Sequence, residues 1–202
     1  MSNSKKAPKS KISNTRFVFK IKLRDVSKPP VWRKIEVPNN ITFQKFSDAI
    51  RSAIGWYGCH LWHFTEQVYS EPAIALPHED DWDKPIDASK TKINQQFNKI
   101  GDKMLYTYDF GDDWIHDVVL EEIKQSNETG CFVVDAKGKC PPEDCGGPWG
   151  YENLKKILND PKNEEYEDML EWLGLKSGKE WNPKEADVEP GEPIGDEPMD
   201  WE

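Results

Sequence analysis

One stretch constrains the fold more than any other: a short acidic segment with a central glycine, 109–113, flanked on both sides by alternating apolar residues. Alternation with a period of two is typical of strands that have one buried face. Gly111 supplies the backbone freedom that a tight reversal needs. The sequence therefore predicts a β-hairpin whose tip carries three aspartates. The residues predicted on its buried face are Tyr106, Tyr108, Phe110, Trp114, His116, Val118 and Leu120.

Two strands and a helix are predicted before this hairpin. Residues 16–24 and 31–37 alternate between apolar and mostly polar residues, and the prolines at 29 and 30 lie in the turn between them. Thr42 is a typical N-cap for a helix that runs to about Ile54, and Gly55 is a typical stop. In such a strand-turn-strand-helix opening, or grasp, the helix lies across a sheet. We therefore predict an α+β fold with a mixed, largely antiparallel sheet.

The remaining elements follow from the same patterns. We predict a third strand over 59–69, a long surface loop over 70–89 and a short helix over 91–99. A further strand lies near 131–135. Two helices, 149–158 and 164–173, are predicted to form a C-terminal helical hairpin.

The two ends of the chain differ in charge from the middle. Residues 1–11 carry four lysines and no acid, and residues 185–202 carry eight acids and no base. Low hydrophobicity and many prolines are typical of segments that stay disordered. The sequence predicts a disordered basic arm over 1–14, a single domain over 15–176 and an acidic, proline-rich disordered tail over 177–202.

The charge also narrows the choice of partners. The net charge is −10, and the middle stays acidic without the tails. This argues against general DNA or RNA binding, because phosphate contacts need a basic face. We find neither a signal peptide nor a stretch of roughly 20 apolar residues, so we expect a cytoplasmic protein with no membrane partner. In that compartment the cysteines are thiols or ligands; they are Cys59, Cys131, Cys140 and Cys145.

Arg33 stands out because it shares the apolar face of the second strand. An arginine in such a place has two interpretations. It lies at the sheet margin with its head in water, which we favour, or it is buried and paired with a carboxylate. For a buried Arg33 the first partner to examine is a carboxylate of the hairpin tip.

Two groups of residues have the chemistry of metal ligands. Asp109, Asp112 and His116 suit a hard divalent cation, although a turn whose aspartates accept backbone hydrogen bonds explains them as well. Cys140 and Cys145 have a spacing found in zinc knuckles, with Cys59, His60 or His63 as distant partners; buried thiols in a rigid loop are the favoured alternative. No cofactor is assured, and a divalent metal is the one to test.

Four motifs in order resemble the plasmid pRiA4b ORF-3-like family over about residues 15–173. They are 29–34 (PPVWRK), 55–64 with Gly55-Trp56 and His60 to Phe64, 108–116 (YDFGDDWIH) and 140–147 (CPPEDCGG). The resemblance implies an α+β domain of bacteria and archaea, often encoded near plasmid or insertion-element genes, without an established biochemical function. Some relatives carry a resolvase label. The acidic core here has neither the arginine-flanked nucleophilic serine nor the basic helix-turn-helix of a serine recombinase, so the label has no support.

From the residues we predict a binding module for a protein or a small molecule, with a cleft where the hairpin tip, the strand after His60 and the loop 140–150 meet. The alternative is a metal-dependent hydrolase or nuclease in which Asp109, Asp112 and His116 hold an ion that activates water. Glu143 and Asp144 suit acid-base chemistry if they face a cleft, and are otherwise ordinary solvated acids. The candidate cleft residues are Arg33, His60, His63, Tyr108, Asp109, Asp112, Trp114, His116, Glu143, Asp144 and Trp149.

Overall fold

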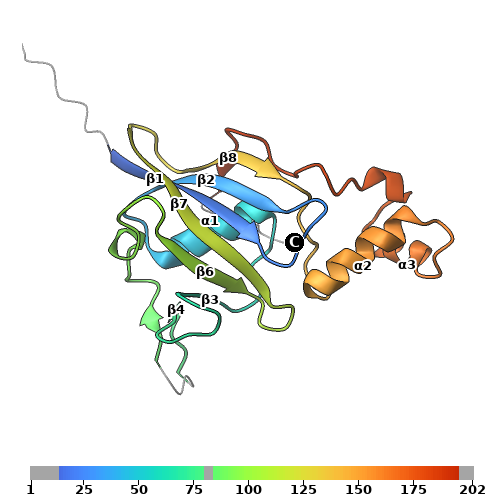
Figure 1. Ribbon diagram of the computed structural model, residues 1–202, viewed down its shortest axis with the longest axis horizontal. Coiled ribbons are helices and arrows are strands. Elements are labelled where there is room, and N and C mark those ends of the chain that lie inside the picture. Colours follow the sequence, from blue (N-terminus) through green and yellow to red (C-terminus); the bar gives the residue numbers. More distant parts are fainter. Residues whose placement is uncertain (1–13, 80–83, 196–202) are drawn as a thin grey trace, which may run out of the picture.

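A computed structural model describes residues 14–79 and 84–195 and contains one nine-stranded sheet (Figure 1). The strand order is β5-β4-β3-β6-β7-β1-β2-β8-β9, and all neighbours are antiparallel except β4 and β5. The prediction of an α+β fold with a mixed, largely antiparallel sheet is confirmed. The strands are β1 (Asn14–Leu23), β2 (Trp32–Pro38), β3 (Trp62–Thr65), β4 (Ile74–Ala75), β5 (Ile86–Asp87), β6 (Lys103–Tyr108), β7 (Trp114–Ser126), β8 (Cys131–Lys137) and β9 (Pro193–Ile194).

The predicted hairpin is the pair β6 and β7, which closes at the pair Tyr108 and Trp114. Its apolar alternation faces the core, where Tyr106, Tyr108, Trp114 and His116 are all buried. Phe110 differs from the prediction and is exposed, because it lies in the turn beyond the last strand pair. The pattern therefore predicted the buried face of the two strands and failed only at the tip.

Helix α1 (Phe43–Ile54) lies across one face of the sheet (Figure 1). The predicted cap is present: the Lys45 backbone N–H donates to the Thr42 hydroxyl over 3.3 Å, and Gly55 takes the left-handed conformation with φ of 103°. Phe46 stacks on Phe64 of the sheet, with ring centroids 5.6 Å apart. Burial of such aromatic side chains is the main force that holds the helix on the sheet.

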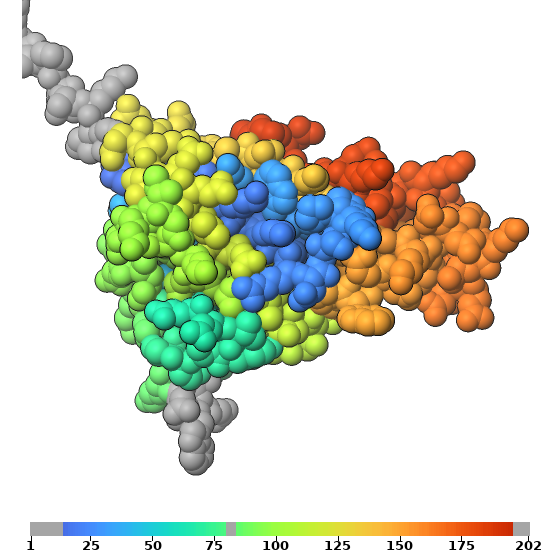
Figure 2. Space-filling model, in the orientation of Figure 1, coloured from blue at the N-terminus to red at the C-terminus, as the bar shows by residue number. Residues whose placement is uncertain are grey.

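Helices α2 (Gly147–Asn159) and α3 (Tyr166–Trp172) form a lobe beside the sheet, coloured orange in Figures 1 and 2. Helix α2 begins two residues before the predicted start. Pro148 fits in its first turn, because backbone N–H groups there have no partner within the helix and proline lacks one. The predicted helix over 91–99 is only a 3₁₀ turn, η1 (Ile93–Gln95). Within the described ranges no helix is long and apolar enough to cross a membrane.

The C-terminal segment differs from the predicted disordered tail as far as residue 195. It contains a second 3₁₀ turn, η2 (Gly178–Glu180), and strand β9, which pairs with the start of β8. Trp181 is buried against Tyr151 of α2, with ring centroids 5.8 Å apart. One large aromatic anchor and an open sheet edge outweigh the low hydrophobicity of this segment. The predicted arm up to residue 13 and the tail from 196 lie outside the described residues.

Candidate functional site

Three segments that are far apart in the sequence meet at the tip of the β6–β7 hairpin. His60, which precedes β3, lies at the centre of a group of carboxylates. Its Nε2 atom is 3.7 Å from Asp109 Oδ2, 3.8 Å from Glu143 Oε2 and 3.2 Å from Asp144 Oδ1. That nitrogen is buried and makes no hydrogen bond to any residue that the structure describes. We call His60, Asp109, Glu143 and Asp144 the His60 cluster.

Asp109 is positioned by the turn that ends β6. Its backbone N–H donates to the Leu61 carbonyl over 2.9 Å, and its Oδ1 accepts a 2.9 Å hydrogen bond from the Gly111 N–H. The residue has φ of 56°, a left-handed conformation that aspartate tolerates better than most residues. These contacts occupy one carboxylate oxygen and leave Oδ2 facing His60.

Glu143 is fixed in the same manner from the loop that precedes α2. Its Oε1 accepts hydrogen bonds from the Tyr57 backbone N–H over 2.7 Å and from the Tyr108 hydroxyl over 2.9 Å. The side chain is only 8 % exposed, and Oε2 is the oxygen that faces His60. Asp109 and Glu143 thus each use one oxygen to hold the fold and keep the other for the cluster.

Aromatic packing holds these three segments together. Trp56 stacks on Tyr108 with ring centroids 4.8 Å apart and planes 17° apart, and its Nε1 donates to the Pro141 carbonyl over 2.9 Å. The His60 ring meets Tyr108 edge to face at 5.7 Å. Burial raises the pKa of Tyr108, and its hydrogen bond to Glu143 adds to this effect. Its hydroxyl therefore stays protonated and acts as a donor to Glu143.

Asp112 joins the loop before α2 to the hairpin tip by a hydrogen bond and is not part of the His60 cluster. Its Oδ2 accepts a hydrogen bond from the Gly146 N–H over 3.1 Å. At Gly147, which has φ of 67°, a Cβ atom would lie 2.4 Å from the Asp112 carbonyl oxygen. Only glycine permits this close approach, so the loop sits directly on the tip.

Asp144 and Cys59 form the exposed side of the site. The Asp144 side chain is 71 % exposed, whereas that of Asp109 is 11 % exposed. The Cys59 sulfur and one ligand atom each of His60 and Glu143 all lie within 4.8 Å of one another. One ligand atom each of His60, Asp109 and Asp144 also lie within 4.8 Å of one another. His60 therefore belongs to two groups of three metal-ligating side chains.

His116 is not near these groups. It is buried between Trp56 and Tyr106, and its Nδ1 lies 3.0 Å from the Tyr106 carbonyl oxygen. Because a carbonyl only accepts, Nδ1 carries the proton. Burial lowers the pKa of His116 to about 4, so the ring is neutral at pH 7. The structure does not bring Asp109, Asp112 and His116 together as ion ligands, because the strand alternation turns His116 into the core.

The two cysteines of the loop also lie outside the groups of ligands found among the described residues. Burial raises the pKa of Cys140 well above its usual value and that of Cys145 to about 12. The Cys140 thiol donates to the Pro141 carbonyl over 3.2 Å. Both are partly buried against the core, and the raised pKa values keep the two thiols protonated at neutral pH.

The other candidate residues take different places. The His63 ring packs against Phe110 with ring centroids 4.9 Å apart, and His63 belongs to neither group of ligands found among the described residues. Trp114 is fully buried in the core, and Trp149 in the first turn of α2 is 89 % exposed. Neither tryptophan forms part of the His60 cluster.

Arg33 is buried, contrary to the favoured prediction, and a hairpin carboxylate is not its partner. Its Nε donates to the Ala53 carbonyl over 2.9 Å, and Nη1 donates to the carbonyls of Gly138 at 3.0 Å and of two further residues. Burial lowers the pKa of the guanidinium. Arg33 thus joins α1 to the end of β8 through backbone carbonyls, a role that side-chain types in the sequence do not reveal.

The sequence analysis placed all four members of the His60 cluster among the candidate cleft residues but did not single them out as one set of ligands. It missed the backbone donors of Tyr57 and Gly58, which bind Glu143 and the Tyr108 hydroxyl, and the packing role of Trp56. The one signal in the sequence for these contacts was the Gly55-Trp56 pair directly after α1. A glycine there ends the helix, and the tryptophan that follows it is a large side chain to be packed.

The chain matches the family model described as plasmid pRiA4b ORF-3-like protein over residues 15–190. It is 36% identical over 152 residues to the uncharacterized protein y4hQ of Sinorhizobium fredii (strain NBRC 101917 / NGR234), an alignment that covers 74% of this chain and 77% of the relative. The crystal structure of the protein of unknown function MM3350 from Methanosarcina mazei Go1 resembles it with a TM-score of 0.74 and 30% identity, covering 86% of this chain and 96% of that one. The family match extends beyond the predicted domain and includes most of the ordered C-terminal segment. The chain therefore belongs to the plasmid pRiA4b ORF-3-like protein family.

Proposed function

We propose that the protein is a binding module whose ligand at the hairpin tip is a divalent transition-metal ion, held by His60, Asp109 and Asp144, with Glu143 as a further carboxylate beside His60. The observation that carries the proposal is the bare Nε2 atom of His60 among three carboxylates, at 3.2, 3.7 and 3.8 Å. Two ligands of a tetrahedral ion with bonds of about 2.0–2.2 Å are roughly 3.3–3.6 Å apart. The three separations fall close to that spacing.

Preorganisation of the carboxylates supports the same conclusion. Ligand oxygens of Asp109 and Asp144 lie within 4.8 Å of each other. Carboxylates this close repel one another unless a proton or a cation lies between them. Here Asp109 and Glu143 are each fixed by hydrogen bonds to one oxygen while the other oxygen faces His60. Metal ligands commonly have such supporting hydrogen bonds, which orient them toward the ion.

The donor set selects the kind of metal. An imidazole nitrogen with carboxylates suits Zn²⁺, Mn²⁺, Fe²⁺ or Co²⁺, whereas Mg²⁺ and Ca²⁺ prefer oxygen ligands only. The nearby Cys59 sulfur adds a soft donor on the exposed side. Zn²⁺ is therefore the first ion to test, with Mn²⁺ as the harder alternative.

Calorimetric titration of the chelator-treated full chain with ZnCl₂ and MnCl₂ tests the proposal. We expect one ion per chain, and a melting temperature that rises with the ion because a ligand that binds only the folded state stabilises it. Asp109→Asn and Asp144→Asn should each weaken binding at least about tenfold. Asparagine tolerates the left-handed conformation at both positions, so these changes remove charge with little backbone strain.

Asp113→Asn is the matched control. Asp113 has φ of 57° in the same turn, but its carboxylate accepts a hydrogen bond from the Tyr69 hydroxyl. The Asp113→Asn variant should bind the ion as tightly as the parent chain. The proposal fails if neither ion binds the parent, or if Asp113→Asn weakens binding as much as Asp109→Asn and Asp144→Asn.

A further inference from the structure

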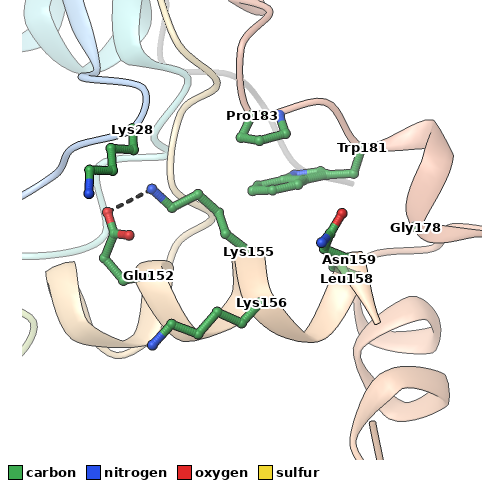
Figure 3. Close-up of a pocket in the computed structure, with 9 residues that line it drawn as sticks. All are labelled: Lys28, Glu152, Lys155, Lys156, Leu158, Asn159, Gly178, Trp181 and Pro183. Carbon is green, nitrogen blue, oxygen red and sulfur yellow. Dashed lines mark hydrogen bonds and ion pairs between the residues drawn. The ribbon is translucent and has the colours of Figure 1, made fainter. Parts of the chain in front are cut away.

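A cavity of about 300 Å³ lies between helix α2, the turn that joins β1 to β2 and the segment after η2 (Figure 3). In Figure 3, Lys28 and Lys155 lie at one end, and Trp181 with Pro183 lies at the other. Its volume is at the lower end of the roughly 300–1,000 Å³ typical of small-molecule sites. None of its lining residues belongs to the His60 cluster, so the cavity is a separate candidate site.

The cavity is basic although the chain has a net charge of −10. Glu152 is the one acid in its wall, and its charge is compensated: the Lys155 ammonium donates to Glu152 Oε1 over 2.6 Å and to the Ser27 carbonyl over 2.9 Å. Lys28 and Lys156 also line the cavity, and their side-chain ammoniums make no hydrogen bond or ion pair within residues 14–79 and 84–195. The wall therefore carries uncompensated positive charge.

Lys28 is held at the cavity by the turn that carries it. The Ser27 N–H donates to Glu152 Oε1 over 3.2 Å, so this contact and the Lys155 contact fasten the turn to α2. Lys28 has φ of 59°, which a lysine rarely adopts. Such conformations persist where the surroundings fix them, and they are enriched at functional sites. Figure 3 shows the Lys28 side chain directed toward Glu152 and Lys155.

The opposite end of the cavity differs in character. Trp181 and Leu158 are buried and give it an apolar wall, and Pro183 lies beside the indole in Figure 3. This end also adjoins the last turn of α2, whose carbonyls and helix dipole disfavour an anion. The charge distribution therefore orients a ligand with its anionic group toward Lys28 and its uncharged part toward Trp181.

We propose that this cavity binds a small organic anion that carries a flat ring, with its phosphate or carboxylate bound by the Lys28 ammonium and its ring against Trp181. The ammonium supplies charge-assisted hydrogen bonds, and the indole wall supplies apolar contact. This site acts independently of the proposed metal site.

Nuclear magnetic resonance titration of the ¹⁵N-labelled full chain tests this assignment, with Trp181→Phe used to identify the Trp181 indole N–H signal. The probes are adenosine monophosphate and benzoate, with adenosine as the ring without an anion and inorganic phosphate as the anion without a ring. A chelator is present throughout, so that no metal ion links the phosphate to the His60 cluster. We expect at least one of the two ring-bearing anions to shift the signal in a saturable manner, and adenosine and inorganic phosphate to bind at least tenfold more weakly.

Lys28→Asn should weaken binding of that anion at least tenfold, because asparagine tolerates the left-handed conformation but lacks the charge. Lys176→Asn removes an exposed lysine outside the cavity wall and should bind like the parent chain. The assignment is overturned if neither ring-bearing anion shifts the Trp181 signal at millimolar concentration, if adenosine binds as tightly as adenosine monophosphate, or if Lys28→Asn binds like the parent. Asp144→Asn, which removes a proposed metal ligand, should leave anion binding unchanged.

Discussion

The Tyr108 hydroxyl donates a hydrogen bond of 2.9 Å to Oε1 of Glu143, and this bond joins strand β6 to the loop before α2. The same hydroxyl accepts from the Gly58 N–H over 3.2 Å. One phenol thus connects all three segments that meet at the His60 cluster.

We predict that Tyr108→Phe lowers both stability and metal affinity. A hydrogen bond to a charged group contributes about 1.5–3 kcal/mol, and the Gly58 N–H also loses its acceptor. The free energy of unfolding in urea should fall by about 2 kcal/mol, and zinc affinity by about tenfold, because Glu143 loses a support. Tyr69→Phe is the control, since the Tyr69 hydroxyl donates to Asp113 at an exposed position. Equal losses in both variants would contradict the role given to Tyr108.

The free energy of unfolding should fall as the pH falls from 6.5 to 4, because of His116. Burial lowers its pKa from 6.5 to about 4 in the folded chain, so the unfolded chain binds more protons in this range. The stabilisation is complete above pH 6.5 and lost progressively down to pH 4, in total about 3 kcal/mol. Urea unfolding of the parent and of His116→Asn across this range measures the difference. A parent and a variant with parallel pH profiles would refute the assignment.

Arg33→Ala should destabilise the protein by about 3 kcal/mol, because carbonyls of α1 and β8 lose a buried charged donor. Arg24→Ala is the control: Arg24 pairs with Asp117 where both side chains are more than a third exposed, and such pairs contribute at most about 1 kcal/mol. The double variant Arg33→Ala with Asp109→Ala should show additive losses, since the two side chains share no contact among the described residues. A large coupling energy between the two substitutions would indicate that Arg33 and Asp109 interact, contrary to the structure.

Gly147→Ala should cost more stability than Gly174→Ala. Both glycines have nearly the same φ, 67° and 65°, so the backbone strain of an alanine is matched. At Gly174 nothing lies within 4 Å of the added Cβ, whereas at Gly147 it would lie 2.4 Å from the Asp112 carbonyl oxygen. We expect about 1–2 kcal/mol of strain at Gly174 and a larger loss at Gly147, together with weaker metal binding. Indistinguishable melting curves for the two variants would argue against close seating of the loop on the hairpin tip.

Local sequence patterns predicted most of the fold. The alternation in 31–37 placed Arg33 on the apolar face of its strand, and the capping residues Thr42 and Gly55 marked the ends of α1. The same alternation placed His116 beside Trp114 and Val118 in the core. The hypothesis that His116 binds an ion conflicted with this pattern, and the structure agrees with the pattern.

The candidate site, in contrast, depended on contacts that no local pattern encodes. Glu143 binds the Tyr57 N–H, which is 86 residues away in sequence, and Arg33 binds carbonyls, which every residue has. The ordered segment after residue 176 depends on one buried tryptophan and on an open edge of β8.

The sequence by itself determined the strands, the helices and their buried faces, because periodicity and capping act between neighbouring residues. Only the tertiary structure decided which side chains face one another where the loops meet. The strand order brings β3 beside β6, and glycine lets the loop before α2 approach the hairpin tip, so His60 comes to lie among Asp109, Glu143 and Asp144. Such long-range contacts form because the whole core packs in one way, which no single stretch of the chain specifies.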